Sequence, residues 1–153
     1  MLKINEMTKA EITDIYLRNI KRLQAEINSY NSDAALWEVR GVISNSGGNL
    51  ILHLIGNLNH FLGATLGKTA YVRNREAEFN IKDFSKQHLI EMLEETNNQV
   101  NHTMNSLPEF ELQKEYPYDF AGKHTTEYYL VFFIAHFEYH LGQINYHRRM
   151  LTI

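Results

Sequence analysis

The stretch TEYYLVFFIAHFEYHLGQINYHRRML, residues Thr126 to Leu151, decides the fold that we expect for this chain. It is apolar or aromatic without a break from Tyr128 to Ala135. A helix that is apolar nearly all round is buried nearly all round. We therefore expect a long C-terminal helix buried on almost every face.

Four polar residues share one face of this predicted helix. Counted from His136, His140 lies four residues later, Gln143 seven and His147 eleven. On a helix these offsets return to within about 40° of the starting direction. Two histidines four residues apart can point their ring nitrogens at one metal ion. The pattern favours metal ligation by His136 and His140, while the alternative is a stripe of solvated or hydrogen-bonded side chains.

Three earlier segments also carry helical patterns, with polar caps and apolar residues at spacings of three and four. They are residues 8–30, in which Thr8 and Glu11 form a capping box, residues 49–66, and residues 85–107, in which Ser85 is the N-cap. Four helices of this length bury their apolar faces most simply as a four-helix bundle. The sequence thus predicts an all-α fold with a single domain over residues 1–153.

The second predicted helix is interrupted by a polar stripe of its own. Asn49, His53, Asn57 and His60 are spaced four, four and three residues apart. Alone, such a stripe is typical of a solvent-facing surface. Facing the stripe of the last helix, it would build a polar pocket inside the bundle, where helical proteins place metal and cofactor sites. Either His53 or His60 is then a third histidine ligand.

Two long connections join the helices. Residues 67–82 mix Arg73 and Arg75 with Glu76 and Glu78, which is typical of a solvated loop, although a structured crossover or a functional lid would also account for the length. The sequence assigns no role to the Arg73–Phe79 segment. The second connection follows Pro108, and its apolar residues are expected to pack onto the bundle: Phe110, Leu112, Tyr116, Tyr118 and Phe120.

Composition excludes several classes of protein. The chain has 153 residues, a formal charge of −3 and no basic run, which argues against a nucleic-acid surface. It has no cysteine, so a metal must be held by nitrogen and oxygen, and the default location is intracellular and cytoplasmic. Neither a signal peptide at the N-terminus nor a membrane span is expected.

The histidine pattern also excludes two familiar metal sites. Phe137 follows His136, so the glutamate of a HExxH peptidase is missing. Neither histidine-bearing helix has the Glu-x-x-His pair of a di-iron bundle. Three imidazoles with a fourth position left to water would instead make an open, zinc-type catalytic site.

Three stretches of the chain resemble a known family: NLILHLIGNL (residues 49–58), GKTAYVRNREAEF (67–79) and HFEYHLGQI (136–144). Through them the chain resembles the DinB/YfiT-like superfamily of metalloenzymes, and more narrowly its DinB-like subgroup of unknown function. The resemblance covers nearly the whole chain. It implies an up-down-down-up bundle with a long crossover between the second and third helices, and a divalent-metal site formed by His53, His136 and His140. It also implies a homodimer. Leu141 stands where many relatives have a basic residue before Gly-Gln.

Members of that superfamily with known activity are metal-dependent transferases and isomerases that use low-molecular-weight thiols such as bacillithiol. The resemblance therefore implies a thiol S-transferase acting on small electrophiles, with zinc as the expected metal and nickel, iron or manganese as alternatives. Further pocket candidates are His60, Asn57, Gln143 and His147, with Glu138 and Tyr139 as weaker ones. No catalytic residue is assigned.

Two other functional classes compete with the enzyme. One is a non-catalytic metal- or ligand-binding bundle of a stress response, in which the same histidines hold metal without turnover. The other is a structural dimer whose histidines have no ligand. Metal content distinguishes the structural dimer from the other two, and turnover with a thiol distinguishes the enzyme from the binding module.

Overall fold

The computed structural model describes residues 7–151, so the first six residues of the stretch inspected for a signal peptide lie outside it. Its long helices are α1 (Lys9–Asn28), α3 (Gly47–Leu58), α5 (Lys86–Ser106) and α6 (Thr126–Met150). The short ones are α2 (Asp33–Leu36) and α4 (Arg75–Asn80), and a 3-10 helix covers Glu109–Gln113. No strand occurs within residues 7–151, so the all-α prediction is confirmed.

The helix starts follow from local capping chemistry. Thr8 and Glu11 form the expected capping box, in which the Thr8 side chain accepts from the Glu11 backbone and the Glu11 carboxylate accepts from the Thr8 backbone. Ser85 caps α5 and Thr125 caps α6, each through its side-chain oxygen. The predicted boundaries of these three helices are therefore correct to within one or two residues.

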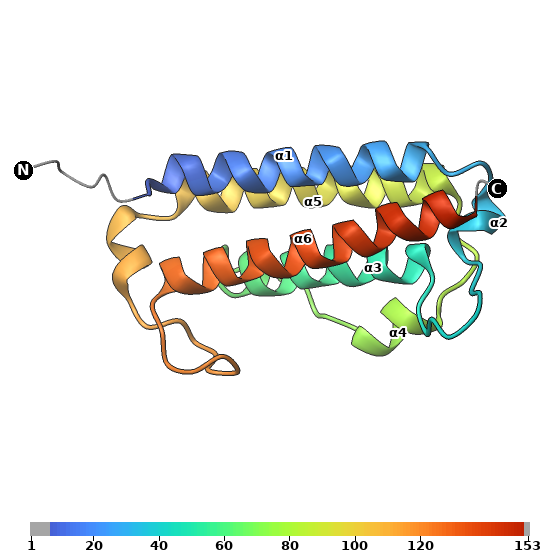
Figure 1. Ribbon diagram of the computed structural model, residues 1–153. Helices are drawn as coiled ribbons and strands as arrows, with labels where there is room; N and C mark the ends of the chain where they lie inside the picture. Colours follow the sequence, from blue (N-terminus) through green and yellow to red (C-terminus); the bar gives the residue numbers. More distant parts are fainter. Residues whose placement is uncertain (1–6, 152–153) are drawn as a thin grey trace, which may run out of the picture.

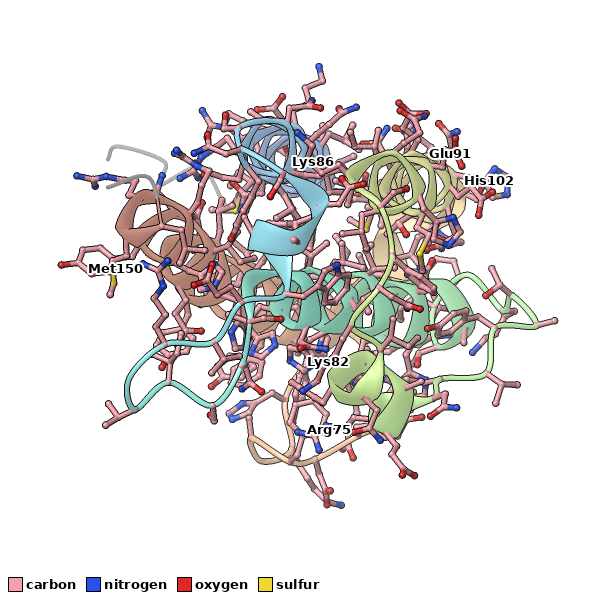
Figure 2. All side chains as sticks on the ribbon, turned by 90° about the vertical axis from the view of Figure 1, so that its right-hand side faces the viewer. Arg75, Lys82, Lys86, Glu91, His102 and Met150 are labelled. Carbon is pink, nitrogen blue, oxygen red and sulfur yellow. The ribbon has the colours of Figure 1, made fainter. Side chains whose placement is uncertain are left out.

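The four long helices lie alongside one another (Figure 1), with α1 and α6 running in one direction and α3 and α5 in the other. Helix α1 contacts α5 and α6, and helix α3 contacts the same two helices. Figure 2, turned by 90°, shows α4, with Arg75, outside α3 on the side away from α1 and α5. Helix α4 thus covers α3 from outside.

The core lies between these helices and consists mainly of aliphatic and aromatic side chains, with a smaller set of buried polar ones. Tyr16, Tyr129, Phe133 and Phe137 are its largest fully buried side chains. The Tyr16 hydroxyl donates to the Leu130 carbonyl at 2.6 Å, which satisfies the polar end of a buried ring and fixes α1 against α6. The inward-facing residues of α5, and Leu107 at its C-cap, are buried: Leu89, Leu93, Thr96, Val100, Thr103, Met104 and Leu107.

The second predicted helix is not one continuous α-helix. Helix α3 ends at Leu58 and continues as a π-helical segment, Asn59–Ala64. A π turn holds an extra residue, so side chains after it are rotated relative to the α-helical pattern. Spacing arguments that carry the stripe of Asn49, His53 and Asn57 on to His60 therefore fail at this point.

The prediction that the last helix is buried nearly all round is wrong. Tyr129 and Phe133 are buried, but Phe132 is 37% exposed. Further exposed apolar residues occur along the same helix: Tyr128, Val131, Tyr139, Tyr146 and Met150. Because α6 packs on α1 and α3 only on its inner side, its outer face lies at the surface.

The two long connections differ in how they pack. In the second, Leu112 and Tyr116 are buried as expected, but the other three residues that were expected to pack are exposed: Phe110 by 63%, Tyr118 by 39% and Phe120 by 54%. The predicted packing is therefore correct for only two of the five. In the first, α4 packs on α3, which makes it a structured crossover and not a solvated loop. No helix within the described part of the chain is long and apolar enough to cross a membrane.

Candidate metal centre

Three histidines from two helices converge at one place between α3 and α6. One ring nitrogen from each of His53, His136 and His140 lies within 4.8 Å of the others. The three ring centroids are 4.5 to 5.2 Å apart, and the rings meet edge to face. His53 is buried, while His136 and His140 are partly exposed. The structure therefore brings together the three residues predicted as ligands.

The spacing of their nitrogens suits a small cation. The Nε2 atoms of His53 and His136 are 3.1 Å apart. Two nitrogens bound tetrahedrally to zinc at about 2.0–2.1 Å lie about 3.3 Å from each other. The two imidazoles thus need little movement to share an ion.

The outward-facing nitrogen of His53 is held by a buried carboxylate that the sequence did not reveal. His53 Nδ1 donates to Glu78 Oε2 at 3.0 Å, and Glu78 is 6% exposed. Arg73 donates to both carboxylate oxygens of Glu78, from Nε at 2.7 Å and from Nη2 at 2.8 Å. Fixing one ring nitrogen by a carboxylate leaves the other unprotonated and aimed inward, as in many metal sites. The Arg73–Phe79 segment therefore orients His53.

Gly56 makes room for this carboxylate on the surface of α3. It lies three residues after His53, and a Cβ at this position would overlap Glu78 Oε1. The absence of a side chain lets Glu78 approach the helix closely enough to reach His53. Here a glycine within a helix serves the site and not a turn.

His140 is oriented by its own helix. His140 Nδ1 donates to Gln143 Oε1 at 2.7 Å, and Gln143 Nε2 donates to the Tyr139 hydroxyl at 3.3 Å. The hydrogen bond fixes the tautomer and leaves His140 Nε2 free to face the other histidines. Gln143 thus acts on His140, as its place on the predicted stripe suggested. Glu138 instead forms an ion pair with Arg22 at 2.6 Å and does not contact the triad of His53, His136 and His140.

The surroundings of His136 and His140 keep these two imidazoles neutral. Burial, followed by the neighbouring His140 and His53, lowers the pKa of His136 to about 4. Burial also lowers the pKa of His140, against an opposing hydrogen bond from Gln143. For Glu78, burial raises the pKa, but the hydrogen bonds and charges of Arg73 and His53 outweigh it, so the net pKa is below its usual range. At neutral pH His136 and His140 are therefore neutral imidazoles, the form that binds metal.

His147 does not join the triad, although it shares the stripe. His147 Nδ1 accepts from the Tyr30 hydroxyl at 2.7 Å, and Nε2 donates to the Glu38 carbonyl at 2.8 Å. Both ring nitrogens are thus occupied by hydrogen bonds that tie α6 to the segment after α1. His147 is a buried structural histidine that does not join the three ligands, and its role as a pocket residue stays a prediction.

The other two pocket candidates lie on α3 and on its π-helical continuation. His60 lies in the π segment, beside the Tyr118 hydroxyl at 3.3 Å, and burial followed by the charge of Arg73 lowers its pKa. Asn57 is 6% exposed and lies one turn after His53 on α3. His88 and His102, both on α5, are exposed.

The sequence held a signal for α4 but not for the burial of Glu78. Asn74 caps this helix by accepting from Ala77 N, and Ile81, four residues after Ala77, packs against the core. The density of charges from Arg73 to Glu78 masked that pattern. The local sequence around a glutamate that an arginine holds in the interior does not differ from the sequence around a glutamate exposed to solvent.

Residues 7–153 match the family described as "Protein of unknown function (DUF1572)". The chain belongs to the DUF1572 family. Because the match spans α1 to α6, the three histidines and Glu78 all lie within the region that defines the family. Membership of this family therefore assigns no activity to the chain.

A solved structure has the same fold. The crystal structure of the conserved protein of a locus from Enterococcus faecalis superposes with a TM-score of 0.74 at 15% sequence identity, covering 95% of this chain and 97% of that one. At this identity the likeness shows the fold alone. A search of curated proteins gives no match.

Proposed function

We propose that this DUF1572 chain is a divalent-metal-dependent enzyme that transfers a low-molecular-weight thiol such as bacillithiol to small electrophiles. In this proposal it forms one DinB-like four-helix bundle with up-down-down-up topology and a crossover that contains α4. The observation that carries the proposal is the convergence of three ring nitrogens within 4.8 Å of one another. The outer nitrogens of two of these rings are fixed by Glu78 and Gln143, as a ligand histidine requires.

The donor set favours zinc, with nickel, iron and manganese as alternatives. Three imidazoles without a carboxylate or thiolate suit zinc and later transition metals better than magnesium or calcium. Three protein ligands leave a position for a substrate, as in catalytic zinc sites. Glu78 is engaged by Arg73 and His53 and therefore serves as a positioning residue and not as a fourth ligand.

In the proposed reaction the thiol loses its proton, its sulfur bonds to the electrophilic carbon, and the leaving group departs with its electron pair. A bound divalent ion would supply the charge that lowers the pKa of the thiol. Glu78 and Gln143 orient His53 and His140, and neutral His136 completes the set. Phe79 packs beside His53, with its ring centroid 5.3 Å from that of the imidazole.

Elemental analysis of protein purified without a nickel column tests the metal site. We expect about one transition-metal ion per chain in the wild type and none in the His136→Ala, His140→Ala double variant. His102→Ala, which removes an exposed histidine from α5, is the matched control and keeps the metal. A wild type that binds no ion after incubation with zinc, nickel, iron or manganese would refute the proposal.

Conjugation of bacillithiol to a model electrophile, such as a chloronitrobenzene, then tests catalysis. We expect turnover by the metal-loaded wild type, and none by the double variant or the chelated protein. Bound metal without turnover across a panel of thiols and electrophiles would favour the non-catalytic metal-binding module.

The exposed apolar face of α6 supports the proposal of a homodimer. Tyr128 and Val131 are each 44% exposed, and Phe132 next to them is 37% exposed. Clustered exposed aromatic and aliphatic side chains are typical of an interaction surface. Light scattering coupled to gel filtration is expected to give twice the chain mass, and the mass of one chain for Phe132→Glu.

A further inference from the structure

A second feature of α6 is a pocket beside the triad that the metal ligands do not line. It has a volume of about 600 Å³ and lies between the segment from Arg40 to Asn45 and the C-terminal half of α6. Small-molecule sites in proteins occupy about 300–1,000 Å³. The pocket is therefore large enough for a metabolite-sized ligand.

The walls of this pocket are mostly apolar and exposed. Val42 and Ile43 come from the loop, and Tyr139, Tyr146 and Met150 come from α6, and each of them is at least 41% exposed. Exposed apolar side chains that gather around one hollow, unlike those scattered singly, indicate a binding site. These residues are the ones that a bound apolar group would cover.

The pocket lies about one helical turn from the triad on both helices. Leu50, which lines it, precedes His53 by three residues on α3, and Gln143, which also lines it, follows His140 by three residues on α6. Gln143 accepts the hydrogen bond that orients His140. A ligand in the pocket would thus touch the residue that positions a candidate metal ligand.

The charge of the lining favours an anionic ligand. Arg40 lines the pocket, and none of the lining residues is acidic. Arg40 forms an ion pair with Glu38, but both side chains are more than a third exposed, and such pairs are worth about 1 kcal/mol or less. The guanidinium can therefore turn to a ligand at little cost.

We infer that this pocket binds the electrophilic substrate of the triad, a small molecule with an apolar body and one anionic group. The apolar body packs between Ile43 and Tyr146, and the anionic group pairs with Arg40. The assignment to a substrate rests on the proposed function, whereas binding itself needs no metal. Ligand binding is therefore measured on the chelated protein.

Gly142 provides a way to fill the pocket without disturbing the fold. It lines the pocket, it is exposed, and a Cβ there meets no atom within 4 Å. Gly142→Leu places an isobutyl group into the hollow and favours the helix, because glycine is a poor helix former. His102→Leu is the matched control, because it introduces the same side chain on α5, outside the pocket. Figure 2 shows His102 and the pocket residue Met150 on opposite sides of the molecule.

The probe is anilinonaphthalene sulfonate, a fluorescent apolar anion, titrated into each chelated protein. We expect saturable binding at one site per chain in the wild type and in His102→Leu, and at least tenfold weaker binding in Gly142→Leu. Tyr146→Ala, which shortens the exposed wall, and Arg40→Gln are each expected to weaken binding about fivefold. Circular dichroism establishes that every variant is folded.

Several outcomes would overturn the inference. They are the absence of saturable binding in the wild type, equal binding in folded Gly142→Leu, and equal binding in Arg40→Gln. A fall in particle mass for Gly142→Leu without loss of probe binding would assign the surface to a second copy of the chain instead. The His136→Ala, His140→Ala variant is expected to bind the probe as the wild type does. Failure of the proposed metal site and failure of the proposed pocket would therefore give different results.

Discussion

Helix α6 carries two kinds of histidine on one face, and they differ in what their ring nitrogens do. His140 has one nitrogen fixed by Gln143 and turns the other toward His53 and His136. Two turns later, His147 has one nitrogen on the Tyr30 hydroxyl and the other on the Glu38 carbonyl. The first arrangement leaves a lone pair available to a ligand, and the second leaves none.

The difference shows that helical spacing alone does not identify a ligand. A ligand histidine needs one nitrogen held by the protein and one left over, whereas a structural histidine uses both. The packing partners decide which case applies. Gly47 allows Tyr30 and His147 to meet, because a Cβ there would overlap the Tyr30 hydroxyl.

The largest expected effect that separates the two histidines is stabilisation by metal. At a zinc concentration about a thousandfold above its Kd, the wild type should gain about 4 kcal/mol in the free energy of unfolding relative to chelated protein. His147→Ala should keep this gain while losing about 2 kcal/mol of metal-free stability, because the half-buried Glu38 carbonyl loses its donor and the Tyr30 hydroxyl keeps only its longer hydrogen bond to the Ile144 carbonyl. The measurement is urea denaturation with and without zinc.

The double variant His136→Ala, His140→Ala provides the opposite case and should lose the zinc-dependent gain entirely. If His147→Ala abolished that gain as well, or if the double variant retained it, the distinction between the two histidines would be wrong.

A smaller effect tests whether Glu78 positions His53. Gly56→Ala should displace the Glu78 carboxylate while keeping every polar residue, and it should weaken zinc binding about tenfold to a hundredfold. Glu78→Gln should have an effect in the same range, since it leaves Arg73 without its anionic partner. Isothermal titration calorimetry measures both affinities.

Gly142→Ala is the matched control for Gly56→Ala, because it makes the same change on a helix where a Cβ meets no atom within 4 Å. Zinc affinity in this control should equal that of the wild type. An unchanged affinity in Gly56→Ala would show that His53 needs no help from Glu78.

The smallest expected effect is the pH dependence of the metal-free protein. Burial lowers the pKa of His136 from 6.5 to about 4, so between these values the unfolded chain binds a proton that the native chain does not. The contribution of neutral His136 to the free energy of unfolding is therefore fully present above pH 6.5 and is lost as the pH falls toward 4. Chelated protein should be about 1–2 kcal/mol less stable near pH 5 than near pH 7.5 in urea denaturation.

His136→Gln should reduce this fall without abolishing it, because burial also lowers the pKa values of His140 and His60, whose contributions to stability are lost in the same direction. Equal slopes in wild type and variant would assign the pH dependence to another group.

The sequence predicted the helices well because capping and periodicity are local. Thr8, Ser85 and Thr125 each satisfy a backbone amide a few residues away, so their role can be read without the rest of the chain. The resemblance and the facing stripes also identified the three histidines that converge. The all-α class and the site candidates follow from such short-range patterns.

The sequence failed where partners lie far away. The burial of Glu78 depends on Arg73, Gly56 and His53 acting together, and the two nitrogens of His147 are occupied by residues more than a hundred positions earlier. The π segment at Asn59–Ala64 changes the angle between successive side chains, so a regular helical wheel misplaces His60. None of these features leaves a local pattern.

The triad also has an order of assembly in time. His53 and Glu78 are separated by 25 residues, and both have been synthesised before α5 begins, whereas His136 follows His53 by 83 residues. During synthesis from the N-terminus, α3 and α4 can associate while α6 is still unmade. The last long helix to emerge brings two of the three imidazoles at once. Capture of a metal ion by this chain would therefore mark the completion of folding.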